Sequence, residues 1–191
     1  MDLEYGFSCM GYEVVAPWGA AMARRQTHPD GLVTSIFGDG SYLMMATEIV
    51  TAVSEGIKLN VVLVQNQGFG SIGSLSESLG SQRFGTRYRY RDPASGLLDG
   101  DVLPVDLAAN AASLGADVIR TRTVKEFQAA LAQSRASDRT TVVYIETDPL
   151  APVPSSESWW DVPVSQTSAL TSTQQARAAY QAAKRDQRIY L

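Results

Sequence analysis

Two polar residues stand where two short apolar runs of the sequence end. Asp39 lies between two glycines in "GDGS", directly after the run "LVTSIF", and Asn66 follows the run "NVVLVQ", 27 residues after Asp39. Carboxylate and amide oxygens are hard ligands of the kind that Mg²⁺ prefers in proteins. The residue types and their spacing therefore predict that Asp39 and Asn66 hold one divalent cation.

The glycines of this segment allow the chain to turn tightly between a strand and a helix. Gly38 and Gly40 flank Asp39, and a helix is predicted to begin near Ser41. Free backbone N–H groups and the positive dipole end of a helix attract an anion such as a phosphate. Asp39 alone would repel that phosphate, whereas a cation between the two bridges them. We expect a diphosphate bound through Mg²⁺, with the carbonyl of Gly68 as a further metal ligand.

A plain structural alternative competes with the metal site, because the tripeptide GDG also occurs in ordinary turns. The tripeptide alone does not decide between the two. The spacing favours the metal site, since one helix joins an aspartate after the first strand to an asparagine after the second. Both residues then fall beyond the carboxyl ends of neighbouring strands, where ligands of open α/β sheets bind.

The alternation of elements predicts an α/β fold with a parallel sheet flanked by helices on both faces. Short runs that are apolar throughout alternate with helical patterns, as in sheets that are covered on both sides. The predicted strands are residues 32–37, 60–65, 116–121 and 141–147, and the predicted helices are 41–56, 106–114, 123–136 and 173–184. The first of these helices carries apolar residues at helical spacing: Leu43, Met44, Ile49, Val50 and Val53. Thr123 with Glu126 three residues on forms a capping-box signature.

The composition changes after Asp148, where a stretch rich in proline and serine begins. The sequence predicts a diphosphate- and metal-binding domain over residues 1–148, followed by an extended arm and a terminal helix over 149–191. Trp159 and Trp160 lie in the arm. Tryptophan buries a large area, so the pair could pack on a partner chain or on the arm's own domain, and both interpretations stay open.

Composition and charge narrow the functional classes. A net charge of −4 with 45% apolar residues is typical of a soluble globular protein and argues against nucleic acid or an anionic membrane as the main partner. The single cysteine, Cys9, allows no disulfide framework and is expected to be a small buried residue; the single histidine, His28, lies in a polar connection. No signal peptide is visible, and no apolar run reaches the roughly 18 residues of a membrane span. We expect a cytoplasmic protein.

The segment "GDG", 24 further residues and then Gln65-Asn66 resembles the fingerprint of thiamine-diphosphate enzymes. The usual fingerprint ends in two asparagines, and Gln65 replaces the first, which is not the family's metal ligand. The resemblance implies two cofactors, Mg²⁺ and thiamine diphosphate. The residues that it implies are Asp39, Asn66 and the Gly68 carbonyl at the metal, and Gly38, Gly40 and Ser41 at the diphosphate.

The upstream stretch "SCMGYEVVAPWGAAMA" resembles the family's segment in which a large apolar residue props the thiazolium ring against the pyrimidine. By position that residue is Met10. The resemblance also implies contacts to the aminopyrimidine from the N–H of Met10 and the carbonyl of Ser8. A flexible thioether can fill the angle between two rings. The alternative, that Met10 is an ordinary core residue, stays open.

Other segments point to one group within these enzymes. "EYGFSCMGYE", "GTRYRYR" and "SWWDVPV" are similar to the 3D-(3,5/4)-trihydroxycyclohexane-1,2-dione hydrolases of myo-inositol catabolism, over essentially the whole chain. The resemblance implies hydrolysis of a carbon–carbon bond that opens a cyclic 1,2-dione to 5-deoxyglucuronate. Two departures are Ala46, where asparagine is usual, and a longer connection between Ala23 and Leu32.

The resemblance covers only the last of the three domains in that family. The glutamate that activates the cofactor lies in the N-terminal domain of a neighbouring subunit, so no catalytic residue is assigned to this chain. We expect a cofactor half-site that needs a second copy or a partner chain with the pyrimidine-binding domain. Two alternatives stay open: a lyase or decarboxylase similar to acetolactate synthase, and a non-catalytic cofactor-binding module.

The segment "RFGTRYRYRD" interleaves arginines and tyrosines between Arg83 and Arg91. Such a pattern can bind single-stranded nucleic acid by phosphate contacts and stacking. The acidic remainder of the chain argues against that interpretation. A solvated or interface strand, and a loop that binds a polyhydroxylated ketone, both remain open.

Overall fold

The computed structural model describes residues 2, 6–7, 9–151, 159 and 161–188. The chain divides into two compact units. The first comprises Met1–Gly68 and Pro104–Pro149, and the second Phe69–Leu103 and Leu150–Leu191. Among the described residues, no helix combines the length and apolarity that a membrane crossing requires.

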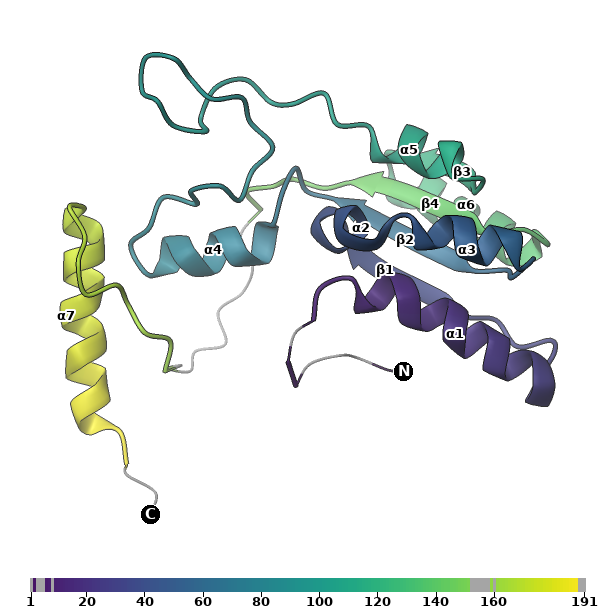
Figure 1. Ribbon diagram of the computed structural model, residues 1–191, viewed down its shortest axis with the longest axis horizontal. Coiled ribbons are helices and arrows are strands. Elements are labelled where there is room, and N and C mark those ends of the chain that lie inside the picture. The colour runs from purple at the N-terminus through teal and green to yellow at the C-terminus, as the bar shows by residue number, and fades with distance from the viewer. Residues whose placement is uncertain (1, 3–5, 8, 152–158, 160, 189–191) are drawn as a thin grey trace. The chain divides into compact units, whose positions relative to one another are not determined.

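A four-stranded parallel sheet forms the centre of the first unit (Figure 1). The strands, in the order β1-β2-β4-β3, are β1 (Thr34–Gly38), β2 (Asn60–Gln65), β3 (Asp117–Thr121) and β4 (Thr141–Glu146). Every neighbouring pair is parallel. The predicted fold class is confirmed, because helices connect and cover these parallel strands.

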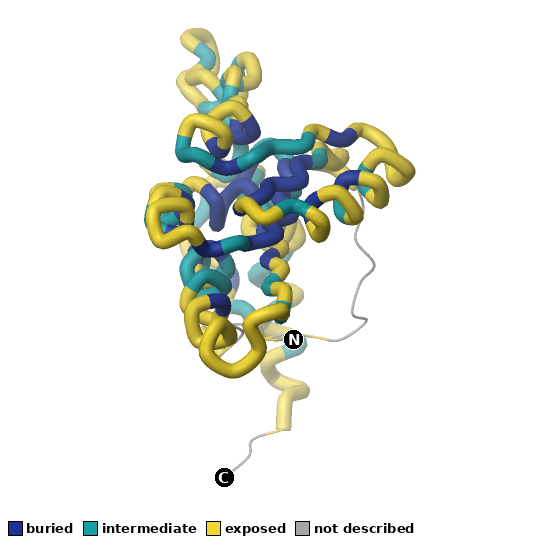
Figure 2. Tube along the Cα trace, turned by 90° about the vertical axis from the view of Figure 1, so that its right-hand side faces the viewer, coloured by how far each residue is buried: buried dark blue, intermediate teal, exposed yellow. Residues whose placement is uncertain are grey.

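Helices cover both faces of the sheet. On one face, Phe37, Leu63 and Tyr144 lie in register and form part of the core with Tyr42 and Leu107. The residues next to them in the strands point to the opposite face, where α6 packs against β3 and β4 (Figure 1). The helices of this unit are α1 (Tyr12–Thr27), α2 (Asp39–Met45), α3 (Glu48–Ser54), α5 (Leu107–Ser113) and α6 (Val124–Ala136). Figure 2 marks the buried residues in dark blue along the trace, and the strands β2 and β4 contain many of them.

The strand β1 is less covered than the sequence predicts. Ile36 is 65% exposed, whereas Ser35 and Phe37 on the other face are buried. The prediction of a strand buried on both faces is therefore wrong for β1, which is an edge strand covered on one face. β2 agrees with the prediction, since five of its six residues are buried.

The helix predicted over residues 41–56 forms two shorter helices. α2 begins at Asp39, two residues earlier than expected, and α3 starts at Glu48 after a break at Ala46 and Thr47. Of the five apolar residues that the sequence pattern singled out, only Ile49 is buried, and the exposed ones are Leu43, Met44, Val50 and Val53. Helical periodicity identifies residues that share a face, but it does not say whether that face is covered. The helix α1, which contains Pro17, was not predicted.

The second unit contains α4 (Gly70–Ser78) and α7 (Thr171–Asp186). The carbonyl of Gly80 accepts hydrogen bonds from Ser172 Oγ at 2.7 Å and Thr173 Oγ1 at 2.9 Å. A Cβ atom on Gly80 would lie 2.5 Å from the Ser172 carbonyl oxygen, so this close approach requires glycine. The predicted terminal helix is present as α7, and α4 was not predicted. The domain boundary at residues 148 and 149 stays a prediction.

The predicted capping box gives a stability test. Glu126 N donates to Thr123 Oγ1 at 3.2 Å, and Thr123 N donates to Glu126 Oε2 at 3.2 Å. Thr123→Ala removes the acceptor at the start of α6 and should cost about 1 kcal/mol of unfolding free energy, or about 2–4 °C in the thermal midpoint. Thr123→Ser keeps the hydroxyl and should cost much less in the same thermal melts. Equal losses in the two variants would show that the hydroxyl does not cap α6.

Candidate functional site

Parallel pairing of β1 with β2 places their carboxyl ends side by side. Gly38 pairs with Val64, so the residues that follow the two strands leave the sheet at the same edge. Asp39 follows β1 as the first residue of α2 and is 1% exposed. Asn66 follows β2 and is half-buried. The register thus brings the two predicted residues to neighbouring strand ends.

Three oxygen-bearing groups meet at this edge. Asp39 Oδ2 accepts a hydrogen bond from Gly68 N at 2.9 Å. The side-chain amide of Asn66 lies 3.0 Å from Asp39 Oδ1 and 2.8 Å from the carbonyl oxygen of Gly68. The carboxylate of Asp39, the amide of Asn66 and the carbonyl of Gly68 therefore form one cluster, which we call the oxygen cluster.

The dimensions of the oxygen cluster fit a magnesium ion. With its oxygen turned toward Asp39 and Gly68, the Asn66 amide would complete a set of three acceptors without a proton between them, which a cation could bridge. At Mg–O distances of 2.0–2.1 Å, oxygens on adjacent vertices of an octahedron lie about 2.8–3.0 Å apart. The distances of 3.0 and 2.8 Å fall in that interval. One carboxylate in the donor set leaves vertices for phosphate oxygens and water, as is common for Mg²⁺.

The described part of the chain contains no group of three or more His, Cys, Asp and Glu side chains placed to hold a metal ion. A cation in the oxygen cluster therefore depends on neutral oxygens for all but one of its ligands from this chain. Such a set carries a single negative charge, which leaves one positive charge of Mg²⁺ for a bound anion to balance. The chemistry of the cluster thus suits a metal–phosphate complex better than a bare metal ion.

The burial of Asp39 affects the ionisation of its carboxyl group. Burial raises the pKa of the Asp39 carboxyl above its ordinary value, and the backbone hydrogen bond from Gly68 opposes that rise. An ionised carboxylate at this depth costs free energy unless its charge is compensated. A cation in the oxygen cluster would offset that cost.

A turn with a left-handed residue, Gln67, brings the backbone N–H of Gly68 to the carboxylate of Asp39. Gln67 has a φ of 65°, in the left-handed region that residues other than glycine rarely adopt. This conformation reverses the chain after Asn66, so that both the N–H and the carbonyl of Gly68 reach the oxygen cluster. The sequence analysis missed the contribution of Gln67, because a glutamine carries no signal for a left-handed conformation.

A buried hydrogen bond between Gln65 and Tyr144 lies in the sheet next to Asn66 of the oxygen cluster. Gln65 is 1% exposed, and its Oε1 accepts from the hydroxyl of Tyr144 at 2.7 Å. The same hydroxyl lies 2.8 Å from Glu146 Oε1. Burial, followed by the hydrogen bond to Glu146, raises the pKa of the Tyr144 phenol. The glutamine that departs from the family fingerprint is thus held by the neighbouring strand β4.

The start of α2 is fixed by a second buried tyrosine that sequence reasoning missed. Tyr42 is fully buried, and its hydroxyl donates to Asn110 Oδ1 of α5 at 2.6 Å. Burial raises the pKa of Tyr42 to about 12. The bond joins α2, which begins with Asp39, to a helix on the same face of the sheet.

The other predicted cofactor residues have clear positions in the first unit. Gly38 ends β1, and Gly40 and Ser41 are buried in the first turn of α2. Met10 is half-buried and precedes Gly11, the N-cap of α1. A Cβ atom on Gly11 would lie 2.6 Å from Met45 Cγ, so the Met10 segment closely approaches the end of α2. Ser8 lies outside the described residues.

Two expectations about single residues have different outcomes. Cys9 is exposed, so the expectation that it is a small buried residue is wrong. The sequence around it is apolar enough to suggest burial, but it precedes the first helix and does not enter the core cluster of described residues. His28 is the exposed C-cap of α1, which agrees with its expected place in a connection.

The arginines of the 83–91 loop mainly support the loop itself. Arg83 forms an ion pair with Glu77 at 2.7 Å, and Arg89 donates to the carbonyl of Gly100 at 2.9 Å. Arg91 donates to the carbonyl of Gly96. These bonds stabilise the fold of the second unit, and the ligand of this loop stays a prediction.

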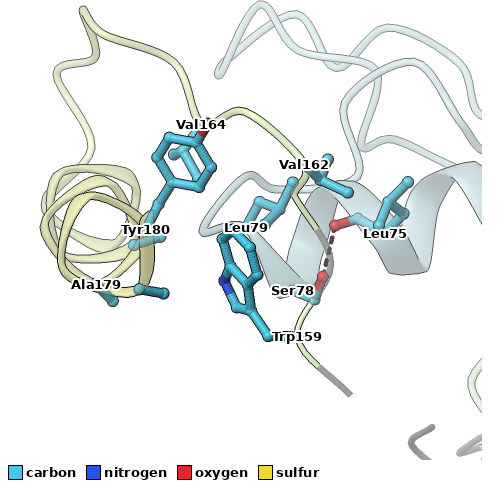
Figure 3. Close-up of a pocket in the computed structure, with 10 residues that line it drawn as sticks. Leu75, Ser78, Leu79, Trp159, Val162, Val164, Ala179 and Tyr180 are labelled. Atoms are coloured by element: carbon cyan, nitrogen blue, oxygen red, sulfur yellow. Dashed lines mark hydrogen bonds between the residues drawn. The ribbon is translucent and has the colours of Figure 1, made fainter. Parts of the chain in front are cut away.

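A cavity of about 650 Å³ lies in the second unit between α4, α7 and the segment around Trp159 (Figure 3). The rings of Trp159 and Tyr180 are 6.3 Å apart, and Leu75 and Leu79 line the same cavity. Trp159 therefore packs within its own unit, although it remains 45% exposed. Trp160 lies outside the described residues.

Comparison with known proteins identifies the family. Residues 1–145 match the family model described as "Thiamine pyrophosphate enzyme, C-terminal TPP binding domain". The chain belongs to this family. The match covers the sheet, the oxygen cluster and the Met10 segment, and it confirms the resemblance that the GDG fingerprint carries.

Relatives with longer chains are similar over most of this one. A "3D-(3,5/4)-trihydroxycyclohexane-1,2-dione hydrolase 2" of Bacillus cereus is 38% identical over 179 residues, which are 94% of this chain and 27% of the relative. The protein named 3D-(3,5/4)-trihydroxycyclohexane-1,2-dione hydrolase in Clostridium tetani is 39% identical over 166 residues, or 87% of this chain and 25% of the relative. The chain thus spans about a quarter of the length of these relatives.

Solved structures share the fold. Benzoylformate decarboxylase from Polynucleobacter necessarius matches with a TM-score of 0.60 at 21% identity, over 73% of this chain and 24% of that one. A thiamine diphosphate-dependent 4-hydroxybenzoylformate decarboxylase of Rhodococcus jostii RHA1 matches with a TM-score of 0.57 at 25% identity, over 73% and 23%. At sequence identities of 21% and 25%, the similarity shows a shared fold.

The burial of Asp39 predicts an unusual stability effect. Asp39→Asn should leave the metal-free protein at least as stable as the wild type at pH 7. The substitution removes a buried carboxyl group whose ionised form is disfavoured by burial. Because the folded-state pKa is raised, ionisation costs stability as the pH rises through it. The advantage of the variant should therefore shrink in acid, where Asp39 is protonated.

Urea denaturation at several pH values measures this difference. Asp106→Asn is the matched control, because hydrogen bonds from Ala109 N and Arg120 lower the pKa of Asp106. That variant should lose stability at pH 7, with the opposite sign. A clear loss of stability in Asp39→Asn at pH 7 would contradict the account of Asp39.

The Tyr144 hydroxyl gives a test of the group around Gln65. Tyr144→Phe leaves the buried carboxamide of Gln65 without this partner and should cost about 1–3 kcal/mol in urea denaturation. Tyr90→Phe changes a tyrosine that is 51% exposed and should have little effect. Equal effects of the two substitutions would argue that the Gln65 bond does not contribute to stability.

Proposed function

We propose that this chain binds the diphosphate of thiamine diphosphate through Mg²⁺, with Asp39, Asn66 and the Gly68 carbonyl as its metal ligands. The observation that carries the proposal is the oxygen cluster, whose spacings of 3.0 and 2.8 Å suit adjacent ligands of one magnesium ion. When bound, thiamine diphosphate supplies a nucleophilic carbon and an electron sink. The protein supplies the position of the cofactor and the environment of its charges.

Each residue of the oxygen cluster has a distinct part in that task. Asp39 supplies the negative charge, and Gly68 N holds one of its oxygens in place at 2.9 Å. Burial of Asp39 keeps water away and strengthens its attraction to a cation. Asn66 adds a neutral oxygen at the end of a buried strand. A rigid strand end and a fixed turn hold the backbone of these groups in place for binding.

The remaining predicted residues would contact the organic part and the phosphates. Gly40 and Ser41 lie in the turn that follows Asp39, and their backbone would face the diphosphate, with Gly38 allowing the approach. Met10 would support the rings of the cofactor, together with the backbone of Ser8. These roles come from the family resemblance and rest on it.

The reaction that we propose is the hydrolytic opening of a cyclic 1,2-dione at a carbon–carbon bond. The dione is 3D-trihydroxycyclohexane-1,2-dione and the product 5-deoxyglucuronate, in cytoplasmic inositol catabolism. Identities of 37–39% to relatives named as this hydrolase support the proposal. Because the chain spans about a quarter of those relatives, it would act as a cofactor half-site. A second copy or a partner chain with the pyrimidine-binding domain would supply the activating glutamate.

A lyase or decarboxylase is the second candidate. Two benzoylformate-type decarboxylases share the fold, so the fold alone does not separate this reaction from dione hydrolysis. The oxygen cluster would serve both reactions equally, since it holds the cofactor and not the substrate. A third possibility, a non-catalytic binding module, shares the same cluster and differs only in its lack of activity with partners.

Calorimetry tests the cofactor proposal on the isolated chain. Thiamine diphosphate should bind only when Mg²⁺ is present, and Asp39→Ala should weaken binding at least about 100-fold, because it removes the only charged metal ligand. Asp117→Ala, which removes an exposed carboxylate near Arg139, is the matched control and should bind as the wild type does. Binding that does not depend on Mg²⁺ or Asp39 would refute the metal site.

Reconstitution with the N-terminal part of a full-length relative separates the reactions. Ring opening of the dione without decarboxylation of benzoylformate supports the hydrolase. The opposite pattern would support the decarboxylase, and cofactor binding without either activity would support the binding module.

A further inference from the structure

The amide of Asn66 occupies a position that two different atoms can fill. The amide atom that faces the oxygen cluster lies 3.0 Å from Asp39 Oδ1 and 2.8 Å from the Gly68 carbonyl oxygen. Both distances suit N–H···O hydrogen bonds, which span about 2.7–3.2 Å. Both also suit adjacent oxygens of a magnesium octahedron, at about 2.8–3.0 Å. The same distances can therefore accommodate either the nitrogen of the amide as a hydrogen-bond donor or its oxygen as a metal ligand.

Without a cation, the nitrogen satisfies this position and the oxygen does not. With the amide oxygen inward, three acceptors face one another without a proton between them. With the amide rotated, its nitrogen donates to Asp39 Oδ1 and to the Gly68 carbonyl. A carboxamide has two N–H protons, so the number of donors matches the number of acceptors.

We propose that Asn66 is a two-position ligand that replaces the cation when the site is empty and turns its oxygen inward when the cation binds. The inference rests on the proposed function, since it concerns the same metal site. In the metal-free protein, the NH₂ group donates to Asp39 and Gly68. Metal binding rotates the amide by half a turn about its last side-chain torsion.

The rotation requires no change in the backbone. The oxygen and nitrogen of a carboxamide are similar in size, so exchanging them leaves the shape of the turn intact. Asp39 retains its bond from Gly68 N in both states. The strained turn at Gln67 can stay as it is. The site is therefore preorganised for the metal, and the metal competes only with two hydrogen bonds.

Nuclear magnetic resonance can observe the amide directly. The chain has three asparagines, Asn60, Asn66 and Asn110, so protein with ¹⁵N-labelled asparagine and ¹³C-labelled aspartate and glycine gives three side-chain NH₂ pairs and observable acceptor carbons. The pair that disappears in Asn66→Asp belongs to Asn66. In the metal-free protein both Asn66 protons should show scalar couplings across hydrogen bonds, to the Asp39 carboxylate and the Gly68 carbonyl.

Saturation with MgCl₂ and thiamine diphosphate should abolish both couplings and shift both Asn66 proton signals upfield. Asn110, which accepts from Tyr42 through Oδ1, is an internal control whose NH₂ signals should move much less. Couplings that persist at saturation would overturn the inference, because the nitrogen would still face the cluster. Their absence in the metal-free protein would overturn it as well.

Two substitutions at Asn66 add an independent readout. Asn66→Asp places a second carboxylate toward Asp39 and removes both donors, so the metal-free thermal midpoint should fall by about 2–4 °C or more. The same variant should bind Mg²⁺ about tenfold more tightly with thiamine diphosphate present, because charge is added and no hydrogen bond is broken. Asn66→Ala should lose metal affinity. Weaker metal binding by Asn66→Asp than by Asn66→Ala would contradict the two-position ligand.

The outcomes separate this inference from the proposed function. If calorimetry finds no Mg²⁺-dependent binding of thiamine diphosphate, both fail. If the cofactor binds through Asp39 while the Asn66 amide keeps its hydrogen bonds, the proposed function stands and the two-position ligand falls.

Discussion

The candidate metal site depends on one buried carboxylate. Asp39 is 1% exposed at the end of an edge strand, and burial raises its pKa. The groups near its oxygens are backbone N–H groups, with that of Gly68 contributing most, and a neutral amide. Neutral dipoles only partly replace the hydration of a carboxylate. The fold therefore keeps a charge that is poorly satisfied by the protein alone, as binding sites commonly do at the expense of stability.

The strand register gives this carboxylate its neighbours, and the sequence predicts the parallel sheet but not the register itself. The central residues of β2 and β4 are apolar, which is typical of strands covered on both faces. Once the strands are parallel, the residues that follow β1 and β2 must leave at one edge, so Asp39 and Asn66 come together. The capping box of Thr123 and Glu126 was predicted for a similar reason, since it depends on residues three apart.

Features that depend on distant contacts could not be predicted. The Tyr144 hydroxyl meets Gln65 across 79 positions of sequence, and Tyr42 meets Asn110 across 68. Local patterns hold no information on such pairs before the register is known. The left-handed Gln67 is a further case, because the surrounding bonds hold a conformation that its residue type disfavours. Periodicity likewise placed Leu43 and Met44 on a helix but could not say that they are exposed.

The proposed cofactor site and the segments that resemble the dione hydrolases lie in different units of the chain. The oxygen cluster and Met10 belong to the first unit, whereas the 83–91 loop and Trp159 belong to the second. The family match extends over residues 1–145, and the metal ligands suit any reaction of thiamine diphosphate. The hydrolase-like segments "GTRYRYR" and "SWWDVPV" lie in the second unit. A substitution at Asp39 therefore tests the proposed cofactor site, whereas substitutions in the segments of the second unit would test the proposed choice between dione hydrolysis and decarboxylation.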